Sequence, residues 1–246
     1  MTPSQDGYRA FHAPRYRYLL DVVERHLPAG DAGVLDVGLS PFAEILGRRL
    51  GRSIDTLGLE QASPAPAPGN PAGRHFPFDL NALDDPRATR PALPRYGLIV
   101  FAEVMEHLHT SPLLPLAFFR EHLVDGGILI VQTPNAASLG KRLKLLAGVN
   151  PYEMIREDRG NPGHFREYTA RELRDLAARA GFTVVALDRR FYFDARHANH
   201  TEDGGMGTPR PWLGALKNVV YSGLPPCLRE GMTVVLRKET SEWRNR

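Results

Sequence analysis

The sequence predicts an α/β fold, in which a mostly parallel seven-stranded sheet is covered by helices on both faces. Short apolar segments typical of buried strands alternate along the chain with segments whose apolar residues recur at helical spacing. The first of these strands ends in a glycine, Gly38, and leads directly into a helix, as in the strand–turn–helix units of parallel sheets. Hydrophobic residues make up 42% and charged residues 24% of the chain, as in a globular protein with a packed core.

Seven segments have the apolar character of strands, and five have the spacing of helices. The expected strands lie at residues 33–38, 53–60, 74–80, 96–102, 128–132, 182–187 and 232–236. The expected helices lie at residues 8–28, 42–50, 112–124, 136–147 and 170–180. Ser40 and Pro41 suit the start of the second helix, and Thr169 suits the start of the last. Residues 62–73 are too rich in proline for a helix or a central strand and predict an extended loop.

Properties of the whole chain exclude several classes of protein. With 31 Lys and Arg residues against 28 Asp and Glu residues, the formal charge is only +3, too small for a dedicated nucleic-acid binder. There is no run of about 18 apolar residues and no signal-like N-terminus, so we expect neither export nor a membrane span. A single cysteine, Cys227, excludes an internal disulfide and favours a reducing, cytoplasmic location.

The domain organisation is expected to be simple. Residues 1–246 fit one domain, because two halves would each have a thin core. We expect residues 1–30 to form an N-terminal lid helix, and residues 188–231 to form an insertion that covers a substrate before the last strand. The lid helix and the insertion could each supply a homodimer contact. Four aromatic residues of the insertion could stack on a small substrate: Phe191, Tyr192, Phe193 and Trp212. A packed strand explains residues 191–193 nearly as well.

A cofactor site is expected beyond the carboxyl ends of the first strands, where the ligands of open parallel sheets bind. Gly38, Leu39 and Ser40 should form the first turn and bring backbone amides close to a ligand. Asp36 lies just before this turn, and Glu60, at the end of the second strand, can accept hydrogen bonds from two ribose hydroxyls. Taken alone, these residues suit a nicotinamide dinucleotide equally well.

The chain contains VLDVG at 34–38, GLE at 58–60, FDL at 78–80, FAEVMEH at 101–107 and LVDGGILIVQTPN at 123–135. Through these motifs it resembles, over roughly residues 15–187, class I S-adenosylmethionine-dependent methyltransferases, which have a Rossmann-like fold. The chain departs from the family pattern where Ser40 and Pro41 replace a second glycine. The resemblance implies S-adenosylmethionine as the cofactor, with Arg15 or Arg17 at its carboxylate, Asp36, Gly38, Leu39 and Ser40 at the methionine part, Glu60 at the ribose, Asp79 and Leu80 at the adenine, and Ala102 beside it.

A second group of polar residues follows the fourth strand. Glu103, Glu106 and His107 have spacings that place them on one face if the segment turns helical. A helix start with favourable acids and a packed histidine explains this triplet by itself equally well. With His164 before the last helix, the pattern resembles a metal-dependent branch that contains ubiquinone-biosynthesis O-methyltransferases and small-RNA 2′-O-methyltransferases. That resemblance implies a divalent metal such as Mg²⁺ or Mn²⁺, with the ligands Glu103, Glu106, His107 and His164.

Together these features predict a metal-assisted O-methyltransferase that acts on a small vicinal diol, such as a sugar, a glycoside or a catechol. Glu106 and His107 would act in catalysis, and His109, two residues beyond His107, is a candidate base. A solvated loop histidine explains His109 as well. Three alternatives stay open: a 2′-O-methyltransferase for an RNA terminus, a metal-free N- or C-methyltransferase, and a cofactor-binding protein without catalysis. Salt dependence, resistance to EDTA and failure to bind the cofactor would distinguish them.

Overall fold

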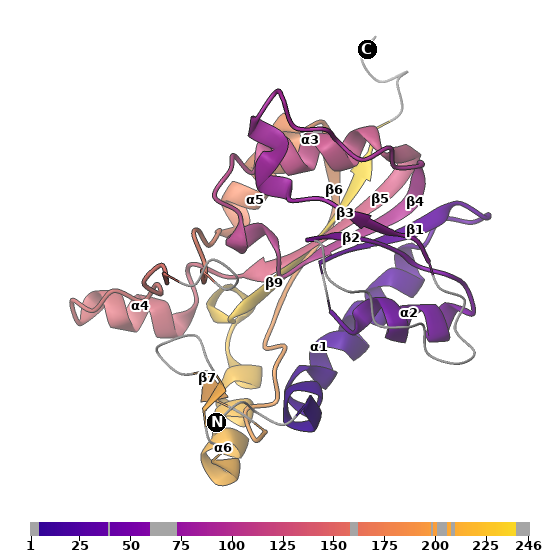
Figure 1. Cartoon of the computed structure of the whole chain (residues 1–246). Coiled ribbons are helices and arrows are strands. Elements are labelled where there is room, and N and C mark those ends of the chain that lie inside the picture. The colour runs from indigo at the N-terminus through magenta and orange to yellow at the C-terminus, as the bar shows by residue number, and fades with distance from the viewer. Residues whose placement is uncertain are drawn as a thin grey trace.

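The computed structural model describes residues 5–38, 40–59, 73–157, 162–197, 199–200, 206–207 and 210–239. A seven-stranded sheet lies at its centre (Figure 1), with the strand order β3-β2-β1-β4-β5-β9-β6. Its strands are β1 (Gly33–Val37), β2 (Asp55–Gly58), β3 (His75–Pro77), β4 (Tyr96–Ala102), β5 (Leu123–Pro134), β6 (Phe182–Arg190) and β9 (Gly231–Lys238). Neighbouring strands from β3 to β5 pair in parallel, and β9 is antiparallel to both β5 and β6. The predicted fold class is therefore confirmed.

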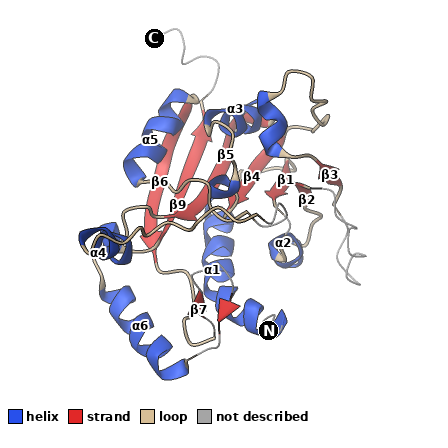
Figure 2. Ribbon diagram, turned by 60° about the vertical axis from the view of Figure 1, so that its left-hand side comes forward, coloured by secondary structure: helices blue, strands red, loops and turns tan. Residues whose placement is uncertain are grey.

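Helices cover both faces of this sheet (Figure 2), as expected for a chain that alternates strands and helices. The α-helices are α1 (Gln5–His26), α2 (Phe42–Leu50), α3 (Leu113–Glu121), α4 (Leu139–Leu146), α5 (Ala170–Arg179) and α6 (Pro211–Gly223). Short 3₁₀ helices occupy Leu80–Asp84, Met105–His107 and Pro226–Leu228. Two short strands that the sequence did not predict, β7 (Asn199–His200) and β8 (Met206–Gly207), pair with each other inside the insertion.

The alternation of side chains along β4 explains how the two layers form. Leu98 and Val100 are buried on one face, in a cluster with residues of α1 and α2. Ile99 and Phe101 are buried on the other face, in a cluster with residues of α3 and α5. Because both faces are covered, the strand reads as a continuous apolar run rather than an alternating one.

The predicted boundary between the third helix and the fifth strand is wrong. The helix was expected over residues 112–124 and the strand over 128–132, but α3 ends at Glu121 and β5 already begins at Leu123. Tyr96 pairs with Leu123 while Leu98 pairs with Ile128, so the residues between them bulge out of the ladder. The Asp-Gly-Gly sequence thus forms an irregularity inside a strand, and Gly126 supports it with a φ of 75°.

Other predicted elements differ mainly in length. The edge strands β2 and β3 are shorter than the expected 53–60 and 74–80, and α4 is shorter than the expected 136–147. Helix α5 begins as predicted, because Thr169 and Glu172 form a capping box in which each side chain bonds the backbone of the other. Among the described helices, no segment is long and apolar enough to cross a membrane.

Candidate active site

The carboxyl ends of β1 and β4 meet at one edge of the sheet, and the turns that follow them are in close contact. Gly38, directly after β1, has a φ of 105°, a conformation that favours glycine. A Cβ atom at this position would lie only 3.0 Å from the Cγ2 atom of Val104 in the turn after β4. A glycine is therefore required here for two reasons, and its backbone stays open to a ligand.

Asp36, in β1 just before this turn, is a buried carboxyl group with an unsatisfied oxygen. Its side chain is only 2% exposed, and its Oδ2 atom has no hydrogen-bond partner among the described residues. Burial raises the pKa of Asp36 to about 8, although the nearby Arg15 guanidinium lowers it. A buried acceptor without a partner is costly unless a ligand donates to it. Asp36 therefore fits the binding of a polar, positively charged ligand group.

The structure separates the two arginines that the sequence left as alternatives. Arg15 is buried on α1 and its Nη1 atom lies 3.9 Å from Oε2 of Glu103, whereas Arg17 is exposed. Arg15 is thus the candidate that faces the carboxyl edge of the sheet. Helix α1 packs on one face of the sheet and contributes Arg15 to this site.

The remaining predicted cofactor residues are distributed as follows. Ser40 accepts a hydrogen bond through Oγ from the Phe42 amide at 3.2 Å, which starts α2. Asp79 is exposed and accepts from the Asn81 amide at 2.9 Å, while the side chain of Leu80 is buried in the core. Ala102 ends β4. Two further candidates, Leu39 and Glu60, lie outside the described residues.

Three of the predicted metal ligands come together. Glu106 and His107 belong to the 3₁₀ helix after β4, and His164 lies in the segment before α5. One potential ligand atom of each residue lies within 4.8 Å of those of the other two. Backbone hydrogen bonds hold the two segments together, because the Phe165 amide donates to the Glu106 carbonyl at 2.8 Å. We refer to Glu106, His107 and His164 as the carboxylate–histidine cluster.

Glu103 does not join this cluster in the way that the sequence predicted. The expected helical face is wrong, because the turn is a 3₁₀ helix of three residues that begins only after Glu103. Glu103 itself has a φ of 55°, which is strained for a residue with a Cβ atom. Its carboxylate is oriented towards Arg15 at 3.9 Å. Glu103 therefore lies between the cofactor residues and the cluster.

The side chains of the cluster have shifted pKa values because they are buried and lie close to other charged groups. Glu106 is 0% exposed, its Oε2 atom accepts from Thr133 Oγ1 at 3.0 Å, and its Oε1 atom has no hydrogen-bond partner among the described residues. Burial, with the charge of Glu103, raises the pKa of Glu106 to about 8. Burial and the neighbouring His164 lower the pKa of His107. Within the described part of the chain, the cluster thus lacks a positive charge that would compensate the Glu106 carboxylate, and it lacks a hydrogen-bond donor for Glu106 Oε1.

Each histidine of the cluster is oriented through its Nδ1 atom. Nδ1 of His107 lies 2.9 Å from the Gly163 carbonyl, and Nδ1 of His164 lies 3.1 Å from Oε1 of Glu167. Glu167 also contacts the ammonium group of Lys141. Burial lowers the pKa of His164, but the Glu167 hydrogen bond and the charge of Glu106 raise it on balance. With Nδ1 occupied in both rings, Nε2 is left for a ligand.

Sequence reasoning missed Glu167 and Lys141 as partners of the cluster. The spacing of Glu167 three residues after His164 was the available signal, because a carboxylate at that distance can orient an imidazole. The predicted base, His109, is exposed and is not one of the three residues of the cluster. Its backbone amide donates to Asn81 Oδ1 at 2.9 Å, and its ring meets Phe165 edge-on with centroids 5.6 Å apart.

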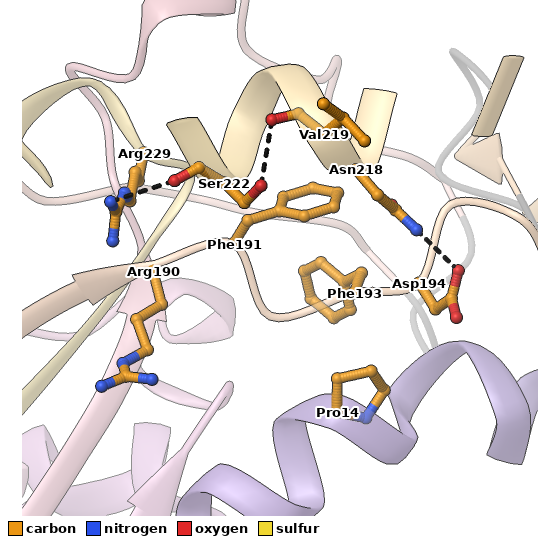
Figure 3. Close-up of a pocket in the computed structure, with 9 residues that line it drawn as sticks. All are labelled: Pro14, Arg190, Phe191, Phe193, Asp194, Asn218, Val219, Ser222 and Arg229. Carbon is orange, nitrogen blue, oxygen red and sulfur yellow. Dashed lines mark hydrogen bonds between the residues drawn. The ribbon is translucent and has the colours of Figure 1, made fainter. Parts of the chain in front are cut away.

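A cavity of about 410 Å³ lies between α1, the end of β6 and α6 (Figure 3). Two of the insertion aromatics, Phe191 and Phe193, line it. Tyr192 is instead buried and its hydroxyl lies 2.5 Å from Thr233 Oγ1, and Trp212 is 72% exposed outside the lining. Of the four aromatics, Phe191 and Phe193 line this cavity, and Tyr192 and Trp212 do not. Tyr192 is used in packing, and Trp212 faces solvent.

The sheet order, the glycine turn after β1 and the buried acid beside it define a Rossmann-like α/β architecture. Residues 11–187 match the family described as methyltransferase domain, and the chain belongs to this family. It is therefore an S-adenosylmethionine-dependent methyltransferase. A comparison with curated protein sequences finds no match.

Solved structures of the same fold cover nearly the whole chain. A SAM-dependent methyltransferase from Archaeoglobus fulgidus is 14% identical with a TM-score of 0.54, covering 91% of this chain and 94% of its own. The CcbJ methyltransferase from Streptomyces caelestis is 16% identical with a TM-score of 0.58, covering 92% and 95%. The glycopeptide N-methyltransferase MtfA, complexed with S-adenosylhomocysteine, is 16% identical with a TM-score of 0.52, covering 93% and 90%. At these identities the likeness shows the fold alone.

Proposed function

We propose that this methyltransferase methylates a hydroxyl group of a small vicinal diol, such as a sugar, a glycoside or a catechol-like metabolite, with the help of a divalent cation. The observation that carries this proposal is the convergence of Glu106, His107 and His164, whose ligand atoms lie within 4.8 Å of one another. The cluster lies at the carboxyl edge of the sheet, next to the residues proposed to bind the cofactor. Glu103 is the proposed fourth ligand.

The donor set of the cluster fits such a cation. Glu106 offers a buried oxygen that lacks a partner among the described residues, and the two imidazoles have their Nδ1 atoms engaged elsewhere. A mixed set of carboxylate and imidazole donors suits Mn²⁺ well and also accepts Mg²⁺. When bound, a divalent cation polarises the oxygens next to it and lowers the pKa of a hydroxyl group.

The residues of the chain then position the acceptor and the methyl donor. Asp36, Gly38 and Ser40 are proposed to hold the methionine part of S-adenosylmethionine, and Arg15 its carboxylate. Arg15 lies 3.9 Å from Glu103, the proposed fourth ligand. This contact supports a cofactor site that is adjacent to the metal site. During transfer the acceptor oxygen bonds the methyl carbon while the carbon–sulfur bond breaks, and its electron pair stays on sulfur. His109 is the proposed acceptor of the hydroxyl proton, which it can release to solvent from its exposed position.

Metal dependence is the direct test of the proposal. We expect dialysed protein to bind one Mn²⁺ by calorimetry, and His107→Ala and His164→Ala to lose this binding while they keep S-adenosylhomocysteine affinity. We expect the protein to transfer the labelled methyl group of S-adenosylmethionine to catechol or sugar diols, and EDTA treatment to abolish this transfer. His26→Ala, at the far end of α1, is the matched control.

Other outcomes would identify the alternatives. Methyl transfer that persists in EDTA and in Glu106→Gln would replace the proposal with a metal-free N- or C-methyltransferase. Methylation of an RNA terminus with steep salt dependence would show a nucleic-acid substrate instead of a small diol. Failure to bind S-adenosylhomocysteine would indicate a protein without catalysis.

A further inference from the structure

Exposed apolar side chains are concentrated in two segments of the molecule. Of the thirteen large hydrophobic residues that are exposed in the described part of the chain, twelve lie within residues 143–155 or 212–220. Leu146 and Met154 are 84% and 86% exposed. Together the twelve are Leu143, Leu145, Leu146, Val149, Tyr152, Met154, Ile155, Trp212, Leu213, Leu216, Val219 and Val220. We call them the α4–α6 surface.

The two segments are neighbours in space. A Cβ atom on Gly140, in α4, would lie 3.4 Å from the hydroxyl oxygen of Tyr221, in α6. Figure 2 shows the same arrangement, with α4 directly above α6 at one side of the molecule. The exposed residues of both helices therefore belong to one region, larger than the scattered apolar residues of an ordinary soluble surface.

Packing within the chain does not explain this region. None of the residues of α4 is buried, and Gly214 is the buried residue of α6. By contrast, α3 and α5 bury their apolar residues against the sheet. Aliphatic and aromatic side chains on α4 and α6 thus face outward and remain available to a partner.

The charge of the two helices indicates the chemistry of that partner. Helices α4 and α6 contain Lys141, Arg142, Lys144 and Lys217 and no acidic residue. Lys141 contacts Glu167, and Lys217 lies 3.8 Å from Glu230, whereas Arg142 and Lys144 are exposed and form no ion pair among the described residues. Within residues 143–155 and 212–220 the one acidic residue is Glu153, after α4, and it is paired with Arg156 at 3.7 Å. The region thus combines apolar residues with an excess of positive charge, a combination that complements an anionic surface.

We propose that the α4–α6 surface docks onto an anionic membrane surface, with its aliphatic and aromatic side chains in the headgroup boundary and Arg142 and Lys144 against the lipid phosphates. A second copy of the chain fits less well, because pairing this region with itself brings cations against cations. The proposed association is peripheral, through side chains at the surface of the two helices. This proposal does not depend on the reaction at the carboxylate–histidine cluster.

Vesicle sedimentation of the full chain tests the proposal. We expect the protein to partition onto vesicles of phosphatidylcholine with phosphatidylglycerol, and much less onto phosphatidylcholine alone. Leu146→Glu and Leu216→Glu should each weaken partitioning tenfold or more, while Ala117→Glu, on the exposed face of α3, should not. Arg142→Gln/Lys144→Gln should weaken it by about tenfold, in contrast to the matched pair Arg171→Gln/Arg174→Gln on α5.

Folding of each variant is confirmed by its affinity for S-adenosylhomocysteine, which these substitutions should leave unchanged. Equal binding to neutral and anionic vesicles, or binding to neither, would overturn the proposal. So would sedimentation equilibrium that shows a dimer abolished by Leu146→Glu, because the occupant would then be a second copy of the chain.

Discussion

Two buried carboxyl groups mark the same edge of the sheet. Asp36 and Glu106 come from different segments, yet each is almost fully enclosed and each has one oxygen without a partner among the described residues. Burying an acid in this state costs stability, and apolar side chains of similar size would pack better. Proteins retain such destabilising groups where a ligand supplies the missing hydrogen-bond donor or positive charge. At the scale of single residues, these two acids therefore carry the functional interpretation.

Asp36→Asn should change the pH dependence of stability. Burial raises the pKa of Asp36 from 3.8 to about 8 in the folded protein. The folded state then holds its proton more tightly than the unfolded state, so the stabilisation is complete below the unfolded pKa and is lost as the pH rises through about 8. We expect the cofactor-free variant to gain on the order of 1 kcal/mol or more over wild type at pH 8.5 relative to pH 5.5.

Urea unfolding at the two pH values measures this difference, and an equal difference at both would show that Asp36 is already ionised. The same variant should bind S-adenosylhomocysteine more weakly than wild type, because an amide replaces the acceptor. Asp84→Asn, in the 3₁₀ helix after Asp79, is a suitable control.

Glu167→Gln should weaken metal binding although Glu167 is not one of the proposed metal ligands. The Glu167 carboxylate fixes His164 through Nδ1 at 3.1 Å, and loss of its charge removes both this orientation and the partner of Lys141. Partners of this kind contribute roughly 10–100-fold to metal affinity. Calorimetry should show Mn²⁺ affinity lowered within that range in Glu167→Gln and further in Glu167→Ala. Affinity for S-adenosylhomocysteine should stay constant, as should both affinities in Glu121→Gln on α3. Unchanged Mn²⁺ affinity would contradict an orienting role.

At the scale of elements, sequence patterns predicted what depends on local chemistry. Strand β4 and helix α2 have the expected bounds, because an unbroken apolar run and a helix closed by Gly51 are local signals. The bulge in β5 was missed because it depends on pairing with β4. The 3₁₀ turn that starts only after Glu103 was missed for a similar reason, because the spacing of residues along the sequence does not show which type of helix forms.

Helix α5 has a role beyond covering the sheet, because its start fixes the segment that carries His164 and Glu167. The Thr169 hydroxyl accepts from the Glu172 amide, and the Glu172 carboxylate accepts from the Thr169 amide at 2.8 Å. Thr169→Ala should lower the free energy of unfolding by about 1 kcal/mol, the usual value of an N-cap. Urea denaturation measures it, with Ser111→Ala as the control. A variant as stable as wild type would show that the cap is dispensable.

At the scale of the whole molecule, the sequence predicted the fold class and the sheet edge at which the candidate site residues meet. The regular alternation of strands and helices was enough for the sheet, and strand ends indicated the edge where the site lies. The insertion was not predictable in the same way. Its α6 helix shows an apolar pattern, but whether that pattern faces a core, a substrate or a partner depends on contacts that composition does not reveal.

The proposed cation would connect segments that are distant in the sequence, and this predicts a global effect of metal binding. Glu106 and His107 follow β4, whereas His164 comes after β5 and α4, so a shared cation stabilises the folded state but has no equivalent site in the unfolded chain. At a Mn²⁺ concentration of about 100 times Kd, the free energy of unfolding should rise by about 2.7 kcal/mol. Thermal denaturation should show this shift in wild type, its reversal by EDTA and its absence in His164→Ala. An equal shift in His164→Ala would place the bound Mn²⁺ elsewhere, and the vicinal-diol preference would lose its physical basis.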